Sequence, residues 1–344
     1  MKALVTGNHG FIGYLLVNEL LKSGHSVTGV DVDYFPRDKI FGRKDAFASS
    51  LSITQLNKDI RDLTIDDFRG FDVVFHLAAL PNDPAGDLNP AVTEDINYLA
   101  TVQLAISSKR AGVRRFVFAS SSSVYGVNGN LQINENSGTY PITPYAVSKL
   151  NSEKVLISMS SKNFAVTCMR NATCYGVSPR MRLDMVLNNF MAYLVTTGKI
   201  RILSDGTTWR PLVHVEDVAR AYTKLLDIDV DLVYSEIFSL GSENFKIGDL
   251  AEVAKSAVDG AEIEYAQDKQ RDMRSYNVNF AKFSSMTGFK PKWNAKSGAF
   301  ELYEAYKAYG LNKENFNDSS FWAGKHFKKL LDTGQIDGSF RFIR

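Results

Sequence analysis

Three glycines near the amino terminus constrain the fold of this chain more than any other feature. Gly7, Gly10 and Gly13 occur in the segment TGNHGFIG, between the short apolar run Ala3 to Thr6 and the helix-like run Ile12 to Leu21. The first glycine permits a tight turn, the second lets the backbone approach a pyrophosphate, and the third allows close contact between helix and sheet. The N–H groups at the start of the helix favour phosphate. The loop therefore predicts a dinucleotide-binding site.

Short apolar runs alternate with helix-like segments along the first half of the chain. The strand-like runs are His25–Val32, Phe71–Leu77, Arg115–Ser120 and Phe164–Arg170, and the later helix-like segments are Asn97–Arg110 and Pro144–Ser160. Strands and helices in this order predict an α/β fold, a Rossmann-type doubly wound parallel sheet with helices on both faces. The helix beginning at Pro144 has Thr143 as its expected cap.

The regular alternation of strand-like and helix-like segments ends near Gly176. Beyond it the predicted elements are mixed, and the later sequence is more polar. We expect a dinucleotide-binding domain over residues 1–176, to which the chain returns around 211–245. Residues 177–210 and 246–344 are expected to form a smaller mixed α/β substrate-binding region. No internal repeat or Pro/Ser-rich linker separates the two.

An acidic residue at the end of the second predicted strand indicates which dinucleotide binds. Asp31 follows Gly13 by 18 residues, and a carboxylate there can accept both ribose hydroxyls of adenosine while repelling a 2′-phosphate. The nearest arginines, Arg37 and Arg43, lie further into the following loop. The alternative is that Asp31 merely begins a solvated turn with Asp33. NAD is favoured over NADP.

A tyrosine and a lysine four residues apart supply candidate proton-transfer chemistry. Tyr145 and Lys149 project from the same face of the helix predicted from Pro144. A phenol with a pKa of about 10 must be acidified to act as a base near neutral pH, and a nearby ammonium together with a positive nicotinamide ring favours the phenolate. Ser121, after the strand RFVFA, can share the proton. The alternative is an exposed amphipathic helix without catalytic function.

Together these residues resemble the extended short-chain dehydrogenase/reductase family, which contains the NAD-dependent nucleotide-sugar epimerases and dehydratases. The resemblance runs from Met1 to about Gly288 and gives Ser121, Tyr145 and Lys149 the catalytic places. It implies that Phe11 and Ile12 belong to the cofactor loop, and that Asp59 and Ile60 contact adenine. Further cofactor contacts implied by the resemblance are Leu77, Ala78, Ala79, Asn97 and Ala172, with Tyr145 and Lys149 counted among them.

The resemblance also implies a nucleoside-diphosphate sugar as substrate. Arg210, in RPLVHVEDVARA, and Arg274, in RDMRSY, match arginines near the nucleotide or its diphosphate. His214 is expected to be structural, and Asp217 to cap the helix that follows it. The other expected substrate contacts are Asn82, in the loop Leu80 to Pro90, together with Ser122, Ser123 and Thr173.

Two positions depart from the family pattern. Ser123 stands where the 4,6-dehydratases carry an acidic residue, and a hydroxyl cannot replace a carboxyl in the elimination of water. The sequence therefore argues against dehydratase activity. Thr173 stands where many relatives have an asparagine that meets the diphosphosugar, so contacts transferred from those relatives are in doubt there.

Composition excludes several other classes of protein. Forty basic against thirty-eight acidic residues leave a net charge of +2, which predicts neither nucleic-acid nor anionic-membrane binding. No apolar run approaches the about 18 residues of a membrane span, and the start of the chain lacks a signal cleavage site. Cys168 and Cys174 are expected to be free, and the five scattered histidines predict no metal site. We expect a cytoplasmic protein.

Three functions are compatible with this reading. The first is an NAD-dependent epimerase acting at C4 of a nucleoside-diphosphate hexose through a keto intermediate. The second is a sugar-nucleotide dehydrogenase or 4-ketoreductase with net redox change, which uses the same residues and differs in releasing the intermediate. The third is a non-catalytic dinucleotide sensor, against which the Ser121, Tyr145 and Lys149 set argues. A homodimer is common in the family and is expected here.

Overall fold

A seven-stranded parallel sheet forms the centre of the computed structural model, which describes residues 1–36, 41, 53–266 and 274–343, with the side chains of residues 129–131 left aside. All of its neighbouring strands pair in parallel, as the alternating pattern predicts. The spatial order across the sheet is β11 (Glu236–Leu240), β7 (Ala165–Asn171), β5 (Arg115–Ser121), β4 (Val73–His76), β1 (Lys2–Thr6), β2 (Ser26–Asp31) and β3 (Thr54–Asn57).

The inner strands are buried on both faces, and their residues alternate between two hydrophobic clusters, whereas no residue of the edge strand β3 is buried. Val5 and Phe75 belong to one cluster, whereas Leu4, Val74 and Phe116 belong to the other. Successive side chains of a strand point to opposite faces, so a continuous apolar run such as FDVVFHL is the expected pattern for a doubly covered parallel strand.

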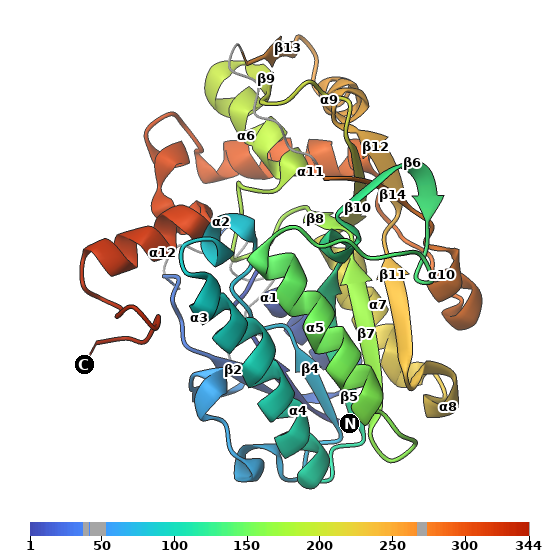
Figure 1. Ribbon diagram of the computed structural model, residues 1–344. Helices are drawn as coiled ribbons and strands as arrows, with labels where there is room; N and C mark the ends of the chain where they lie inside the picture. The colour runs from blue at the N-terminus through green and yellow to red at the C-terminus, as the bar shows by residue number, and fades with distance from the viewer. Residues whose placement is uncertain (37–40, 42–52, 267–273, 344) are drawn as a thin grey trace.

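Helices cover both faces of this sheet (Figure 1). On the face of the Val5 cluster α1 (Gly13–Lys22) packs beside α7 (Val215–Lys224). On the other face lie α4 (Ala100–Arg110) and α5 (Pro144–Met159). Shorter elements around the sheet are η2 (Ile60–Asp62), η3 (Ile65–Phe68), α2 (Asp83–Gly86), α3 (Pro90–Glu94), the π-helical turn η4 (Asp95–Leu99), η5 (Ser122–Tyr125), η6 (Leu225–Asp227) and α8 (Val230–Val233).

Most of the remaining elements gather beyond the carboxyl ends of the central strands, whereas α10 (Ala281–Thr287) lies beside β11 at the edge of the sheet (Figure 1). They include a three-stranded sheet of β12 (Glu243–Lys246), β10 (Trp209–His214) and β8 (Thr173–Tyr175), and two pairs, β13 (Glu262–Tyr265) with β9 (Lys199–Ile202) and β14 (Ser275–Val278) with β6 (Val127–Ile133). The other helices are α6 (Val186–Thr197), α9 (Ile247–Lys255), α11 (Ala295–Tyr309), η7 (Asn315–Asn317), η8 (Ser319–Phe321) and α12 (Ala323–Asp332).

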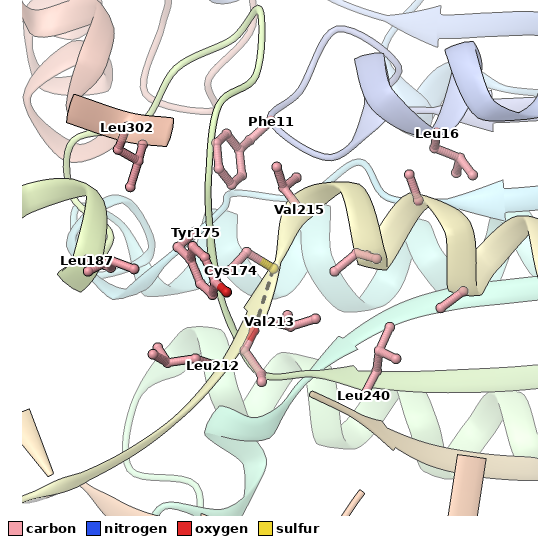
Figure 2. Packing of buried hydrophobic residues seen from close by; sticks show 14 of the residues in the cluster. Phe11, Leu16, Cys174, Tyr175, Leu187, Leu212, Val213, Val215, Leu240 and Leu302 are labelled. Atoms are coloured by element: carbon pink, nitrogen blue, oxygen red, sulfur yellow. Dashed lines mark hydrogen bonds between the residues drawn. The ribbon is translucent and has the colours of Figure 1, made fainter. Parts of the chain in front are cut away.

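The two regions share one large apolar cluster. Figure 2 shows Phe11 of the glycine loop near Val215 at the start of α7 and Tyr175 of β8, with Leu187 and Leu302 further out. This continuity fixes the second region against the glycine loop. Cys168 and Cys174 are both buried and free, as expected. Among the described residues, no helix has the length and apolarity needed to cross a membrane.

Two local predictions are wrong. The helix expected from Asn97 begins earlier, at Pro90, and Asn97 lies inside its π-helical turn, because Asn89 caps the start by accepting the N–H of Val92. Asp217 does not cap α7, since the cap is His214, whose Nδ1 accepts the N–H of Glu216. Thr143, by contrast, caps α5 as predicted, accepting the N–H of Ala146 at 3.2 Å.

Candidate active site

The glycine loop is tight enough to exclude side chains at two of its three glycines. Gly7 has a φ of +72°, and a Cβ there would lie 2.7 Å from the backbone nitrogen of Ala78. A Cβ on Gly13 would lie 2.1 Å from the carbonyl oxygen of Gly7, so this glycine allows the loop to fold onto the start of α1. The sequence predicts helix-to-sheet contact at Gly13, whereas its nearest neighbours are backbone atoms of the loop itself.

Asp31 ends β2 beside this loop, in the position predicted for a ribose-binding carboxylate. Its Oδ2 accepts the N–H of His9 at 3.1 Å, and its Oδ1 accepts the N–H of Asp33 at 2.9 Å. The Nδ1 of His9 lies 2.6 Å from the Oδ1 of Asp33. Burial raises the pKa of Asp31, although the N–H of Asp33 and the charge of His9 oppose this shift. Arg37 and Arg43 lie outside the described residues.

A cavity of about 790 Å³ opens over the glycine loop and the carboxyl ends of the central strands. It brings together nearly all of the site residues predicted from the sequence, despite their distance along the chain. The predicted residues that line it are Gly7, Gly10, Phe11, Ile12, Gly13, Asp31, Asp59, Ile60, Leu77, Ala78, Ala79, Asn82, Ser121, Ser122, Ser123, Tyr145, Lys149, Ala172, Thr173, Arg210 and Arg274.

Asn97 is the exception, since it does not line the cavity. It is buried, and its side chain brackets the backbone of Leu80: the Leu80 N–H donates to Oδ1 at 2.8 Å, and Nδ2 donates to the Leu80 carbonyl at 3.2 Å. Asn97 therefore fixes the loop that follows the wall segment Leu77–Ala79.

Ser121, Tyr145 and Lys149 meet on the floor of the cavity. The Nζ of Lys149 donates to the carbonyl of Ala119 at 2.8 Å and lies 5.8 Å from the centre of the Tyr145 ring. Burial raises the pKa of Tyr145, the carboxylate of Asp83 raises it further, and a hydrogen bond with Ser121 lowers it. The protein alone therefore does not give the acidified phenol predicted from the sequence. That prediction also includes the charge of the nicotinamide ring, which the chain does not supply.

Burial lowers the pKa of Lys149 to about 7, and the nearby carboxylate of Glu153 opposes this shift. Glu153 is itself almost fully buried and binds Arg170 through three contacts of 2.8 to 3.2 Å. Its Oε1 also accepts the hydroxyl of Ser120, the residue before Ser121. A buried ion pair thus lies under the proton-transfer residues and holds their strand and helix together.

Two expected substrate residues, Asn82 and Arg274, interact with carboxylates, Asn82 through a hydrogen bond and Arg274 through an ion pair. Asn82 caps α2 by accepting the N–H of Ala85, and its Nδ2 donates to Asp184 at 2.6 Å. Arg274 forms an ion pair with Asp83, whose other oxygen accepts the hydroxyl of Thr143 at 2.6 Å. In this arrangement, a diphosphate would compete with Asp83 for Arg274.

Three more residues expected to contact the substrate are Arg210, Ser123 and Thr173. The Nη1 of Arg210 donates to the carbonyls of Trp209 and Arg274. The Oγ of Ser123 is buried and makes no hydrogen bond within the described part of the protein. Thr173 begins β8 and is half-buried at the cavity wall.

Sequence reasoning missed two arginines in the cavity, Arg180 and Arg182. Both are buried, and Arg182 forms an ion pair with Asp184 at 2.9 Å. Burial lowers the pKa of Arg180 to about 9, and the charge of Arg182 adds to this shift. The segment PRMRLDM carries a usable signal, since it alternates charged with apolar residues directly after a strand end. Also missed were Trp322 to Lys325 and Phe327, which line the cavity from the carboxyl-terminal part of the chain.

These features fit a dinucleotide. The space over Gly7 is one that a Cβ would fill, Asp31 offers carboxylate oxygens for ribose hydroxyls, and the cavity extends from Asp59 to Tyr145. Within the described residues, no three His, Cys, Asp or Glu side chains are grouped as metal ligands would be. The fold and the site thus define a Rossmann-type dinucleotide-binding protein with a Ser–Tyr–Lys set in the same cavity as the glycine loop.

Comparison with known proteins identifies the family. The model of the NAD-dependent epimerase/dehydratase family matches residues 3–241, so the chain belongs to this NAD-dependent family of enzymes. An uncharacterized UDP-glucose epimerase of Bacillus subtilis, YtcB, is 32% identical over 66% of this chain and 72% of its own length. A putative UDP-glucose 4-epimerase of Methanocaldococcus jannaschii is 28% identical over 86% of this chain and 95% of its own.

Solved structures agree with this assignment. The UDP-glucuronic acid 4-epimerase of Bacillus cereus, in complex with UDP-glucuronic acid and NAD, is 25% identical and superposes with a TM-score of 0.77. The alignment covers 90% of this chain and 99% of that one. The Rossmann-type α/β fold and the family expected from the sequence are therefore confirmed.

Proposed function

We propose that the protein is an NAD-dependent epimerase acting at C4 of a nucleoside-diphosphate hexose through a transient keto sugar. The observation that carries the proposal is the meeting of Ser121, Tyr145 and Lys149 with the glycine loop in one cavity. The relatives support the reaction, since those compared above are named as UDP-glucose or UDP-glucuronic acid epimerases.

Ser121, Tyr145 and Lys149 have different roles in such a reaction. NAD, when bound, supplies reversible hydride acceptance. Tyr145 removes the proton from the sugar hydroxyl and later returns it, and Ser121 shares that proton through its hydrogen bond with the phenol. Lys149, whose Nζ lies 5.8 Å from the centre of the Tyr145 ring, would together with bound NAD favour the phenolate and so oppose the effect of burial on the pKa of the tyrosine. Turning the keto sugar over before hydride returns inverts C4.

The sugar nucleotide is assigned to cavity residues outside the glycine loop. We assign its diphosphate to Arg210 and Arg274, and its sugar to Asn82, Ser122, Ser123 and Thr173, all of which line the cavity. Release of the diphosphate restores the ion pair between Arg274 and Asp83. NAD is assigned to the glycine loop, Asp31, Asp59, Ile60 and Leu77 to Ala79.

A dehydrogenase or 4-ketoreductase with net redox change would use the same residues, so the test must separate the two. The purified protein is denatured and its released nucleotide identified by chromatography and mass spectrometry. The native protein is then given UDP-glucose, UDP-galactose and their uronic acid and N-acetyl analogues without added cofactor. Many turnovers per enzyme, followed by proton NMR of the C4 epimers, support the epimerase. Product formation only in proportion to added NAD or NADH would favour net redox instead.

We also propose a homodimer formed through α4 and α5. Leu99, before α4, and Val147, on α5, are apolar side chains left 53% and 39% exposed on this face. Light scattering after gel filtration should give twice the chain mass for the wild type and the chain mass for Leu99→Asp with Val147→Asp. Leu232→Asp, at an equally exposed leucine of α8, should leave the dimer unchanged. A monomeric wild type would refute this assembly.

A further inference from the structure

The carboxyl-terminal residues 322–343, which we call the C-terminal strap, are not accounted for by the reaction. Figure 1 shows α12, the helix of the strap, beside α2. The two helices are in close contact, since a Cβ on Gly324 would lie 2.9 Å from the carbonyl oxygen of Pro84. The strap thus lies against the loop that carries Asn82 and Asp83.

Aromatic residues attach the strap to the segment that follows Asp31. His326 stacks on Phe35 with ring centres 4.6 Å apart, and Phe327 lies 5.1 Å from Tyr34. The Nε2 of His326 lies 2.7 Å from the carbonyl oxygen of Tyr34, and because a carbonyl only accepts, this nitrogen carries the proton. The segment that follows the predicted ribose-binding end of β2 is therefore in direct contact with the strap.

The end of the strap is attached to the predicted adenine-binding segment. Arg61, which binds Asp59 on one side, donates to the carbonyl of Ser339 at 2.8 Å. Arg341 forms an ion pair with Asp62 at 2.7 Å, and Phe342 stacks on Tyr34 at 5.3 Å. The segment that follows Asp31 and the segment around Asp59, two residues assigned to NAD, are thus each held by the strap.

The strap also forms part of the cavity wall. Trp322, Lys325 and Phe327 line the same cavity as Asp31 and Asp59. A ligand bound between these two carboxylates and the glycine loop has the strap on its outer side. Phe327, Leu330 and Phe340 of the strap are buried in the core, whereas the end of the strap is attached by partly exposed groups, since the side chain of Arg341 is 40% exposed. Such contacts are weak enough individually to open.

We propose that the C-terminal strap is part of the cofactor site and slows the exchange of NAD by closing over its adenosine half. The inference rests on the NAD site assigned under the proposed function. An epimerase regenerates NAD in every turnover, so it benefits from a cofactor that stays bound through many cycles. An enzyme with net redox change must exchange its cofactor each time. The strap therefore favours the first type of reaction.

The test compares cofactor dissociation in full-length variants freed of nucleotide. Each protein is loaded with radiolabelled NAD, and loss of label is followed by rapid filtration after excess unlabelled NAD is added. Arg341→Ala with Phe342→Ala removes two partly exposed attachments of the strap. We expect dissociation to be about tenfold faster, since an ion pair and a stacked aromatic pair are lost together. Labelled ADP-ribose, which contains the adenosine half, should dissociate faster to a similar degree.

A matched control removes an ion pair on the exposed side of the same helix. Lys328→Ala with Asp332→Ala deletes a contact of 2.9 Å between two largely exposed side chains that do not line the cavity. NAD dissociation should stay within about twofold of the wild type. An unchanged rate in the strap variant, or an equal acceleration in the control, would overturn the role of the strap while leaving the NAD site intact. Failure of the wild type to bind NAD would overturn both.

Discussion

Replacing Glu153 with glutamine should destabilise the protein strongly, although the two side chains have the same shape. The side chains of Glu153 and Arg170 are 1% and 4% exposed, so both charges are buried away from solvent. Burial lowers the pKa of Arg170, but its hydrogen bonds to Glu153 outweigh this effect and raise the pKa overall. Glu153→Gln leaves the guanidinium charged and faces it with an amide donor. Removing one partner of such a pair costs about 3–5 kcal/mol, a large part of the about 5–15 kcal/mol of a typical protein.

Urea denaturation followed by circular dichroism measures this loss as a change in the free energy of unfolding. Asp66→Asn is the control, because the ion pair between Arg69 and Asp66 has side chains 69% and 81% exposed and should contribute less than about 1 kcal/mol. Glu153→Met combined with Arg170→Met removes both charges and should be more stable than either single variant. A loss below about 1 kcal/mol for Glu153→Gln would refute the reasoning, because removing one charge of a buried pair would then not leave the other uncompensated.

Glu153→Gln should also affect the catalytic reaction, because it changes the pKa of Lys149. The pKa of this lysine is lowered to about 7 by burial, and Glu153 opposes that shift. Without the carboxylate the pKa falls further, so the ammonium form is lost at a lower pH. If turnover requires the ammonium, its decline on the alkaline side moves to lower pH in Glu153→Gln. A pH profile of kcat that keeps the position of the wild type would separate the stabilising role from the electrostatic one.

Three further outcomes are expected. Tyr145→Phe should reduce kcat by about 10²–10⁴ while NAD affinity, measured by calorimetry, stays nearly constant; retention of a tenth of the wild-type rate would remove the tyrosine from its role. Asp31→Ser should weaken the binding of NAD and lower the ratio of NAD affinity to NADP affinity in fluorescence titrations. A wild type that already prefers NADP would contradict this role of Asp31. Because Ser123 offers no carboxyl, long incubation with UDP-glucose should give no C6 methyl doublet in proton NMR, and such a signal would contradict the argument against dehydratase activity.

The parts of the site that could be predicted are those encoded over a few residues. Gly7 to Gly13 combine a turn, a close backbone approach and a helix start within one loop, so composition and spacing suffice to recognise them. Tyr145 and Lys149 share a helix face because of the helical repeat alone. The order of strands and helices likewise restricts the sheet to a parallel one, since parallel strands need crossover connections.

The parts that could not be predicted depend on contacts between distant segments. Arg274 and Asp83 are 191 residues apart, and neither sequence neighbourhood indicates the other. The sequence predicts that Asn97 contacts the cofactor, but its partner in the structure is Leu80, which reaches it only once the loop after β4 is in place. The acidification of Tyr145 was inferred from charge alone, and the competing burial appears only when the cavity wall is assembled.

Substitutions of local groups and of distant groups should change different steps of the reaction. In the proposed mechanism the local groups Tyr145 and Lys149 take part in proton transfer, and their substitution should act on kcat. The distant groups, Asp83 with Arg274 and the C-terminal strap, line the cavity and are held by an ion pair, which a bound anion can replace, and by aromatic contacts. Their substitution should therefore act first on the exchange of cofactor and substrate. Whether the protein releases its keto sugar or returns it as an epimer depends on that exchange, because both reactions share the same proton-transfer residues.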